Sequence, residues 1–216
     1  MSLTLVRRYA LTLGLVIALS GCVGSLLGGG KPDRLYRFGP TASAAASAPI
    51  GQPARVLAVP PPQFAPDIGG DRILTVAGQD NAYLKDMRWV SPAPTLYAGT
   101  IETTLAERAP DMIVATRAIG AQPDARLAIE IDRFEARYDD DGKAAPTIHI
   151  EGRAVLIDTR TKAIIGRYRI AAAETARSDT GAAIAAAFDT AARASTVSLV
   201  DWVNVSIPLP GVTARK

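Results

Sequence analysis

The sequence is poor in the residue types that most often carry chemistry. It has one cysteine, one histidine and 6% aromatic residues among 216. A single cysteine cannot form an intramolecular disulfide, so a fold held together by disulfide bonds is excluded. A single histidine also removes any zinc site that needs two imidazoles. With so few reactive residues in the chain, the position of its one thiol, Cys22, is the first feature to explain.

Long apolar runs are also missing. A transmembrane helix needs about 20 apolar residues, and the nearest candidate, residues 10–20, has eleven. This run follows Arg7 and Arg8, and a basic start followed by a short apolar run is typical of a secretory signal. We expect residues 1–21 to be a signal peptide and no other segment to span a membrane.

Leu19, Ser20 and Gly21 precede Cys22 at the end of this signal. An aliphatic residue, two small residues and a cysteine resemble the bacterial lipobox, in which the cysteine is lipidated and becomes the acylated N-terminus. Two or more acyl chains hold a protein on a membrane for long times, whereas one anchors it only marginally. Cys22 is thus interpreted as an anchor and not as a nucleophile. The alternatives are a cysteine that happens to end the apolar run of a signal, or one buried as a small apolar residue.

The residues after the cysteine suggest where the anchor lies. In the lipoprotein sorting scheme of Gram-negative bacteria, an aspartate after the cysteine favours retention in the inner membrane. Val23 stands there instead, which indicates the periplasmic face of the outer membrane. Residues 22–34 contain four glycines and a proline and are expected to form a flexible tether.

Charge gives no sign of a nucleic-acid partner. The signal holds two of the 24 Lys and Arg residues and none of the 21 Asp and Glu residues, which leaves 22 cations and 21 acids. No basic stripe is present, so we expect no nucleic acid to bind. A hydrophobic content of 48% suits one domain with a packed core, expected at 35–207, before a frayed tail at 208–216.

The first part of this domain mixes short strands with one helix. Strands are expected at 35–38, 55–59, 72–77 and 112–116, and irregular structure at 79–86. Ser91 is expected to cap a helix that runs from Pro92 to Arg108. The Ala-, Ser- and Pro-rich residues 41–53 are expected to form a linker or long loop.

The second part alternates apolar and polar residues. The segments 127–138, 148–156 and 164–172 are joined by polar turns, which is typical of an antiparallel meander. The apolar parity shifts near Asp132 and Arg133, where we expect a β-bulge. Asp179 would cap a last helix, whose apolar stripe comprises Ile184, Phe188, Ala191, Ser195, Leu199 and Trp202. The predicted fold class is α+β, an antiparallel meander with two helices packed on one face.

Candidate catalytic and metal-binding residues are scattered. His149 lies between two isoleucines, so alternation places it on the solvated face of its strand. The acidic turn at 139–142 does not fit a calcium loop, because Gly142 at the sixth position would place Arg137 first and Ile148 twelfth. Gly30-Lys31 lacks the remaining residues of a phosphate-binding loop, and no G-x-S-x-G motif is present.

The carboxylates of the meander are expected to pair with arginines across the strands. The acids are Glu130, Asp132, Glu135, Glu151 and Glu174, and the arginines are Arg133, Arg153, Arg167 and Arg169. We therefore expect no catalytic residues, no metal and no cofactor. The absence of a motif favours a binding or scaffolding role over an enzyme.

The order of these segments resembles a known family. A lipobox precedes LYRF at 35–38, a strand that ends in prolines at 56–60, and GGDRILTVAGQDNAYLKDMRWVSPAPTLYAGTIETTLAER, which contains Tyr83 and Trp89. LAIEIDRFEA, HIEGRAVLIDTRTKAIIGRY and an Ala-rich helix follow. This arrangement resembles the ABC-type transport auxiliary lipoproteins, the group that includes the paraquat-inducible protein C type. The insertion at 41–53 departs from the more compact members.

The resemblance implies a non-enzymatic outer-membrane lipoprotein that docks an MCE-domain protein. That partner binds lipid and works with an inner-membrane ABC transporter, which moves phospholipid or other apolar molecules across the periplasm. Members of the group can assemble into rings, so the resemblance also allows a homo-oligomer.

Two other functions remain open from the sequence. The first is a lipoprotein that itself carries an apolar ligand between its sheet and helices. Alanines of the last helix would leave room for such a ligand, although small residues equally permit tight packing; they are Ala182, Ala183, Ala185, Ala186 and Ala187. The second is an envelope hydrolase, which would need His149 or a pair of carboxylates.

Overall fold

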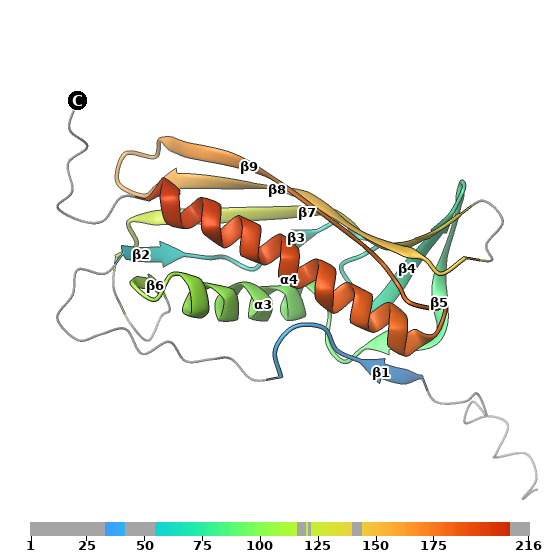
Figure 1. The fold of residues 1–216 in the computed structure, drawn as a ribbon. Helices are drawn as coiled ribbons and strands as arrows, with labels where there is room; N and C mark the ends of the chain where they lie inside the picture. Colours follow the sequence, from blue (N-terminus) through green and yellow to red (C-terminus); the bar gives the residue numbers. More distant parts are fainter. Residues whose placement is uncertain (1–32, 42–54, 116–119, 121, 140–143, 208–216) are drawn as a thin grey trace, which may run out of the picture. The chain divides into compact units, whose positions relative to one another are not determined.

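Strands are more abundant than helices in the described part of the chain from residue 34 onward. The computed structural model describes residues 33–41, 55–115, 120, 122–139 and 144–207. Within these residues one sheet of nine strands is covered by two helices, α3 (Ala93–Arg108) and α4 (Gly181–Ser206) (Figure 1). The signal, the lipobox, most of the tether and the 41–53 loop, the end of the acidic turn and the tail lie outside the described residues.

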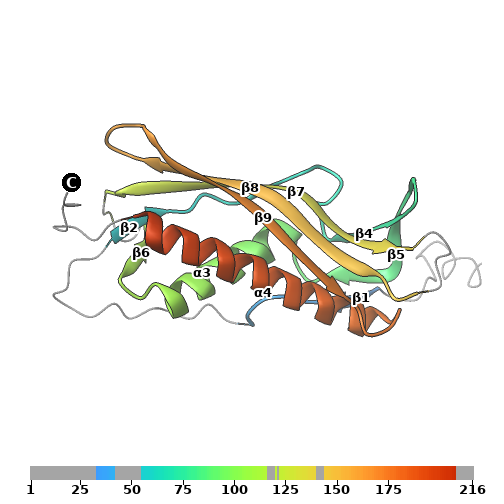
Figure 2. The same ribbon diagram turned by 45° about the horizontal axis from the view of Figure 1, so that its top comes forward.

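The sheet is organised around β7, which spans Ala125–Tyr138. One edge of β7 pairs antiparallel with β8 (Thr147–Asp158), and β8 pairs antiparallel with β9 (Ile164–Thr175). The predicted meander is confirmed. Both helices lie on the same face of this meander (Figures 1 and 2), which confirms the α+β class.

The predicted β-bulge in β7 is also confirmed. The pairing register between β7 and β8 shifts between Ile131 and Arg133. Gly152 of β8 lies opposite this shift, and a Cβ atom at Gly152 would overlap the carbonyl oxygen of Glu130. Position 152 must therefore be a glycine, because the backbone of the β-bulge occupies the space that a side chain would need.

The other edge of β7 receives three short strands in succession. β2 (Arg55–Ala58), β3 (Gln63–Phe64) and β4 (Arg72–Ala77) all pair with it in parallel. β6 (Met112–Val114) extends the sheet beside β2, β5 (Asp80–Trp89) pairs antiparallel with β4, and β1 (Arg34–Tyr36) pairs parallel with β5. This half of the sheet is mixed, a feature that the local sequence pattern did not predict.

Several local predictions were wrong. Of the residues expected to be irregular, 80–86 belong to β5, whose first residues, Asp80 to Ala82, are all exposed and so show no apolar alternation. α3 begins after Pro92, not after a Ser91 cap, because the amide of Ala93 donates to the carbonyl of Gly70 at 3.0 Å.

The start of α4 also differs from the prediction. Its N-cap is Thr180, whose hydroxyl accepts from the amide of Ala183 at 3.4 Å. Asp179 instead accepts a hydrogen bond from the Tyr138 hydroxyl at 2.5 Å. The predicted cap was therefore one residue early, because the carboxylate is engaged by the end of β7.

Aromatic rings fill the space between the sheet and the helices. Phe38 and Trp89 meet edge to face at 5.0 Å, and Phe134 lies 4.9 Å from Phe188 of α4 between ring centroids. The predicted stripe of α4 is buried from Ile184 to Leu199, whereas Trp202 is partly buried and stacks on Tyr168 at 5.3 Å. Clustered aromatic pairs add about 0.5–1.5 kcal/mol each beyond the area that they bury.

Candidate functional site

The first described segment of the chain is held tightly to the domain. Leu19, Ser20, Gly21 and Cys22 lie outside the described residues. The segment that we call the strap, residues 33–41, begins eleven positions after Cys22. Its strand β1 pairs with β5, the carbonyl of Tyr36 accepts from the amide of Val90 at 2.8 Å, and Phe38 is 1% exposed. The strap thus ties whatever precedes it to the core.

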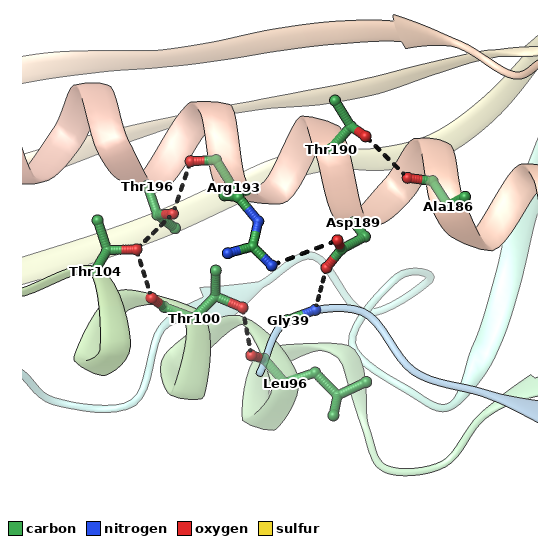
Figure 3. A network of polar contacts seen from close by, with 9 residues as sticks. All are labelled: Gly39, Leu96, Thr100, Thr104, Ala186, Asp189, Thr190, Arg193 and Thr196. Atoms are coloured by element: carbon green, nitrogen blue, oxygen red, sulfur yellow. Dashed lines mark hydrogen bonds and ion pairs between the residues drawn. The ribbon is translucent and has the colours of Figure 1, made fainter. Parts of the chain in front are cut away.

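Gly39 completes the strap with a contact that only glycine allows. Its φ of +75° favours glycine, and a Cβ there would overlap the Thr100 hydroxyl. Its amide donates to Asp189 of α4 at 2.7 Å, and Asp189 pairs with Arg193 at 3.5 Å (Figure 3). Both helices therefore contact the strap.

Hydroxyl groups line the seam where α3 meets α4. Thr104 and Thr196 share a hydrogen bond at 3.2 Å, and each also bonds a carbonyl of its own helix (Figure 3). Tyr97 bonds Ser195 at 2.9 Å, and burial raises the pKa of Tyr97 to about 12, so its hydroxyl stays protonated. The hydroxyl of Thr103 is buried without a hydrogen-bond partner among the described residues.

Arg55 closes the opposite end of α4. Its side chain is 5% exposed and pairs with Asp111 at 2.7 Å. One guanidinium nitrogen donates to the carbonyls of Asn204 and Ile207, both at 2.7 Å, and another to the side-chain oxygen of Asn204. The last carbonyls of a helix have no partner within the helix, so Arg55 supplies donors that α4 itself lacks.

The outer face of the meander, away from the helices, carries the predicted cross-strand pairs. Arg153 pairs with Glu130 and, at 3.0 Å, with Asp132. Glu151 accepts Arg133 at 3.5 Å and lies 3.9 Å from Arg169. These carboxylates therefore act as partners of arginines, which agrees with the sequence prediction.

The remaining candidates of the outer face are less closely grouped. Glu135 pairs with Arg137 of its own strand at 2.7 Å, not across strands. His149 is half-buried on this face, between Ile148 and Ile150, which are fully buried as the alternation predicted. Within the described part of the chain, no group of three or more His, Cys, Asp or Glu side chains could hold a metal ion.

The alanines of α4 divide between the surface and the core. Ala182 and Ala186 are exposed, whereas Ala185 and Ala187 are each 5% exposed and belong to the core with Phe188. Small residues here let the helix approach neighbouring side chains closely. This packing favours direct contact over a ligand space as the reason for the alanines.

Sequence reasoning missed Arg55 and Asp189. Both are charged residues whose partners lie about 150 positions away, so no local spacing could reveal them. The glycine at position 39 was a local indication that the backbone adopts a conformation with positive φ in this segment.

Comparison with known protein families identifies the family of this chain. A model of the ABC-type transport auxiliary lipoprotein component family matches residues 36–199. The chain belongs to this family. It is therefore an auxiliary lipoprotein component of ABC-type transport, as the resemblance implied. No helix within the described residues has the length and apolar character needed to cross a membrane.

Solved structures are similar to this lipoprotein to different degrees, and the first two below share its fold. A Xanthomonas campestris protein of the DUF330 family is 25% identical, with a TM-score of 0.65 over 80% of this chain and 96% of that chain. An uncharacterized protein is 14% identical, with a TM-score of 0.63 over 80% and 99%. The PelC dodecamer of Paraburkholderia phytofirmans is 15% identical, with a TM-score of 0.39 over 71% and 93%. No curated protein matches the chain.

Proposed function

We propose that this lipoprotein is non-enzymatic, is anchored through Cys22 to the periplasmic face of the outer membrane, and docks an MCE-domain protein of a lipid-transporting ABC system. The family match over residues 36–199 carries the proposal. In this reading residues 1–21 are removed as a signal, residues 22–34 form the tether, and 35–207 form the docking domain.

Two features of the fold support a docking role. The strap ties the chain that follows the lipobox to both helices, so a pull on the anchor is transmitted to the core. The outer-face carboxylates Glu130, Asp132 and Glu151 pair with arginines, which supports a structural role for them. Such a domain can hold a partner near a membrane without reacting with it.

The anchor is tested by labelling cells with a radioactive fatty acid. The wild-type chain is expected to be labelled and to fractionate with the outer membrane, and Cys22→Ser to remain unlabelled. Val23→Asp is the matched control, because it should keep the label and move the protein to the inner membrane. A labelled Cys22→Ser chain would contradict the lipobox interpretation.

Docking is tested by affinity purification of the full chain from detergent extracts. The MCE-domain protein and the transporter subunits of the same bacterium are expected to be retained. Native mass spectrometry of the purified lipoprotein distinguishes the alternative function. Bound lipid would support a carrier, whereas a spectrum of protein alone supports docking.

A further inference from the structure

The end of the outer face at the β8–β9 turn differs from its centre. The register between these strands shifts between Leu156 and Ile157, so one residue of β8 faces both Ile164 and Ile165 of β9. This bulge re-aims the two side chains, which are 50% and 40% exposed. Strict alternation from the buried Ile170 would place Ile164 on the helix-covered face, and the bulge turns it to the outer face instead. Val155 and Ile157, half-buried on the outer face, continue the apolar surface.

Cations surround these aliphatic side chains. The exposed residues Arg160 and Lys162 lie in the turn, and Arg126 and Arg167 flank Ile157 and Val155 in the strand register. No ion pair to a described acid is present for any of the four, in contrast to Arg153 and Arg133 at the centre of the face. We call this surface the hairpin patch: Arg126, Val155, Ile157, Arg160, Lys162, Ile164, Ile165 and Arg167.

The nearby acids are already engaged. Asp158 accepts the amide and the hydroxyl of Thr161 at 2.6 and 2.8 Å, and these bonds hold its pKa below the ordinary value. Asp124 accepts the amide of Val56 at 2.8 Å. Both acids line a hollow of about 630 Å³ at the base of the turn together with Arg160 and Lys162. Two carboxylates, one of which also interacts with Arg160, stand against four cations, so the net charge of this surface is positive.

The patch rests on a firm base. Gly166 of β9 lies against Trp202 of α4, where a Cβ would come within 3.0 Å of the indole. Trp202 stacks on Tyr168, and the amide of Thr159 bonds the carbonyl of Asp124 at 3.0 Å. A surface that is fixed before binding loses less conformational freedom when a partner arrives.

The hairpin patch and the strap lie at opposite ends of α4 (Figures 1 and 2). A Cβ on Gly181, at the start of the helix, would approach the Tyr36 hydroxyl to 2.9 Å, whereas Trp202 near its end contacts Gly166. At 1.5 Å per residue these two points are about 30 Å apart. The patch is thus presented away from the point where the tether enters the domain.

We propose that the hairpin patch is the surface through which this lipoprotein contacts its periplasmic transport partner, which meets it with acidic side chains around an apolar centre. The inference rests on the proposed docking function. Protein interfaces are enriched in arginine and depleted of lysine, and three of the four cations here are arginines. The aromatic residues favoured at a bilayer interface, Trp202 and Tyr168, belong to the opposite, helix-covered side of β9.

The test measures binding of the lipidated full chain, in detergent, to the purified MCE-domain protein. Ile165→Asp and the pair Arg160→Glu with Arg167→Glu are each expected to weaken binding about ten-fold or more, because an apolar centre and a charge match are lost. The arginine variant should also lose most of the salt dependence of binding. Urea unfolding of each variant verifies that the fold is retained.

Matched controls lie outside the hairpin patch. Val205→Asp places the same charge at an 82% exposed site of α4, and Arg177→Glu reverses an exposed cation without a described ion pair. Both should bind like the wild type. If the wild type binds and the patch variants bind within about two-fold of it, the patch is not the docking surface. If the wild type itself does not bind, the proposed function fails instead.

Two further measurements separate other occupants of the patch. A thiol-reactive probe on Ile165→Cys, in the full lipidated chain on vesicles of phosphatidylethanolamine and phosphatidylglycerol, should remain accessible without the partner. Protection there that depends on the anionic lipid would assign the patch to the bilayer and overturn the inference. A fall in the oligomeric mass of the chain alone in the patch variants would assign it to a second copy, with the same consequence.

Discussion

Arg55 offers the most demanding test of how the fold is held together. Replacing Arg55 by methionine keeps the apolar stem of the side chain but removes the guanidinium donors that it supplies to the end of α4. The carbonyls of Asn204 and Ile207, the side-chain oxygen of Asn204 and the carboxylate of Asp111 would all lose their partner. A buried acceptor left without a donor costs about 1–3 kcal/mol. Asp111 is 30% exposed and can bind water instead.

The expected loss of unfolding free energy is about 3–5 kcal/mol, the range found when one partner of a buried ion pair is removed. Equilibrium unfolding in urea measures it, with an unchanged slope showing that the transition is of the same kind. Amide hydrogen exchange should also become faster in the last turn of α4, because the carbonyls there are no longer held.

Arg108→Met is the matched control. Arg108 of α3 forms a two-bond contact with Asp201 of α4 at 2.7 and 2.8 Å, but their side chains are 44% and 48% exposed. Water can replace this contact, so the loss should be clearly smaller. The reasoning is refuted if Arg55→Met unfolds within about 1 kcal/mol of the wild type, or if the two variants lose the same stability.

Four other variants test single features of the fold, each by urea unfolding unless stated. Phe38→Ala should lower stability by about 3–5 kcal/mol, because it empties the aromatic cluster beneath the strap; an unaffected variant would show that the strap is not integral to the core. Thr103→Val should raise stability by about 1 kcal/mol, because it removes a buried hydroxyl without a described partner; a loss would reveal a partner for that hydroxyl. Gly152→Ala should lower stability by about 1–3 kcal/mol through overlap with the bulge, and retention of full stability would argue against the bulged register. The pKa of Asp158, measured by NMR titration, should rise toward its ordinary value in Thr161→Val. The stability linked to the depressed pKa is present above the unfolded-state value and disappears as the pH falls through the folded-state value.

The meander was predictable because the sequence pattern that specifies it is local. The alternation of apolar and polar residues predicted which side chains of β7, β8 and most of β9 face the helices. The shift in this alternation at Asp132 and Arg133 predicted the bulge. The parallel pairing of β2, β3 and β4 with β7 was not predictable, since each partner lies 60 or more positions away. The polar first half of β5 was missed because a strand exposed on both sides carries no periodic signal.

The site was less accessible to sequence reasoning than the fold. Cross-strand pairing of Arg153 with Glu130 followed from strand order and alternation. The hairpin patch did not, because a bulge of one residue decides that Ile164 faces solvent. The sequence predicted Asp179 as the cap of α4, and its bond with Tyr138, which no local pattern reveals, leaves Thr180 in that role.

The place of β7 in the chain has a consequence for how the protein matures. During synthesis, β2, β3 and β4 leave the ribosome well before residues 125–138 exist to complete their hydrogen bonds. A nascent chain cut short before β7 therefore holds backbone groups that cannot find their native partners. Completion of the amino-terminal half of the sheet must therefore wait until the chain has been synthesised through β7.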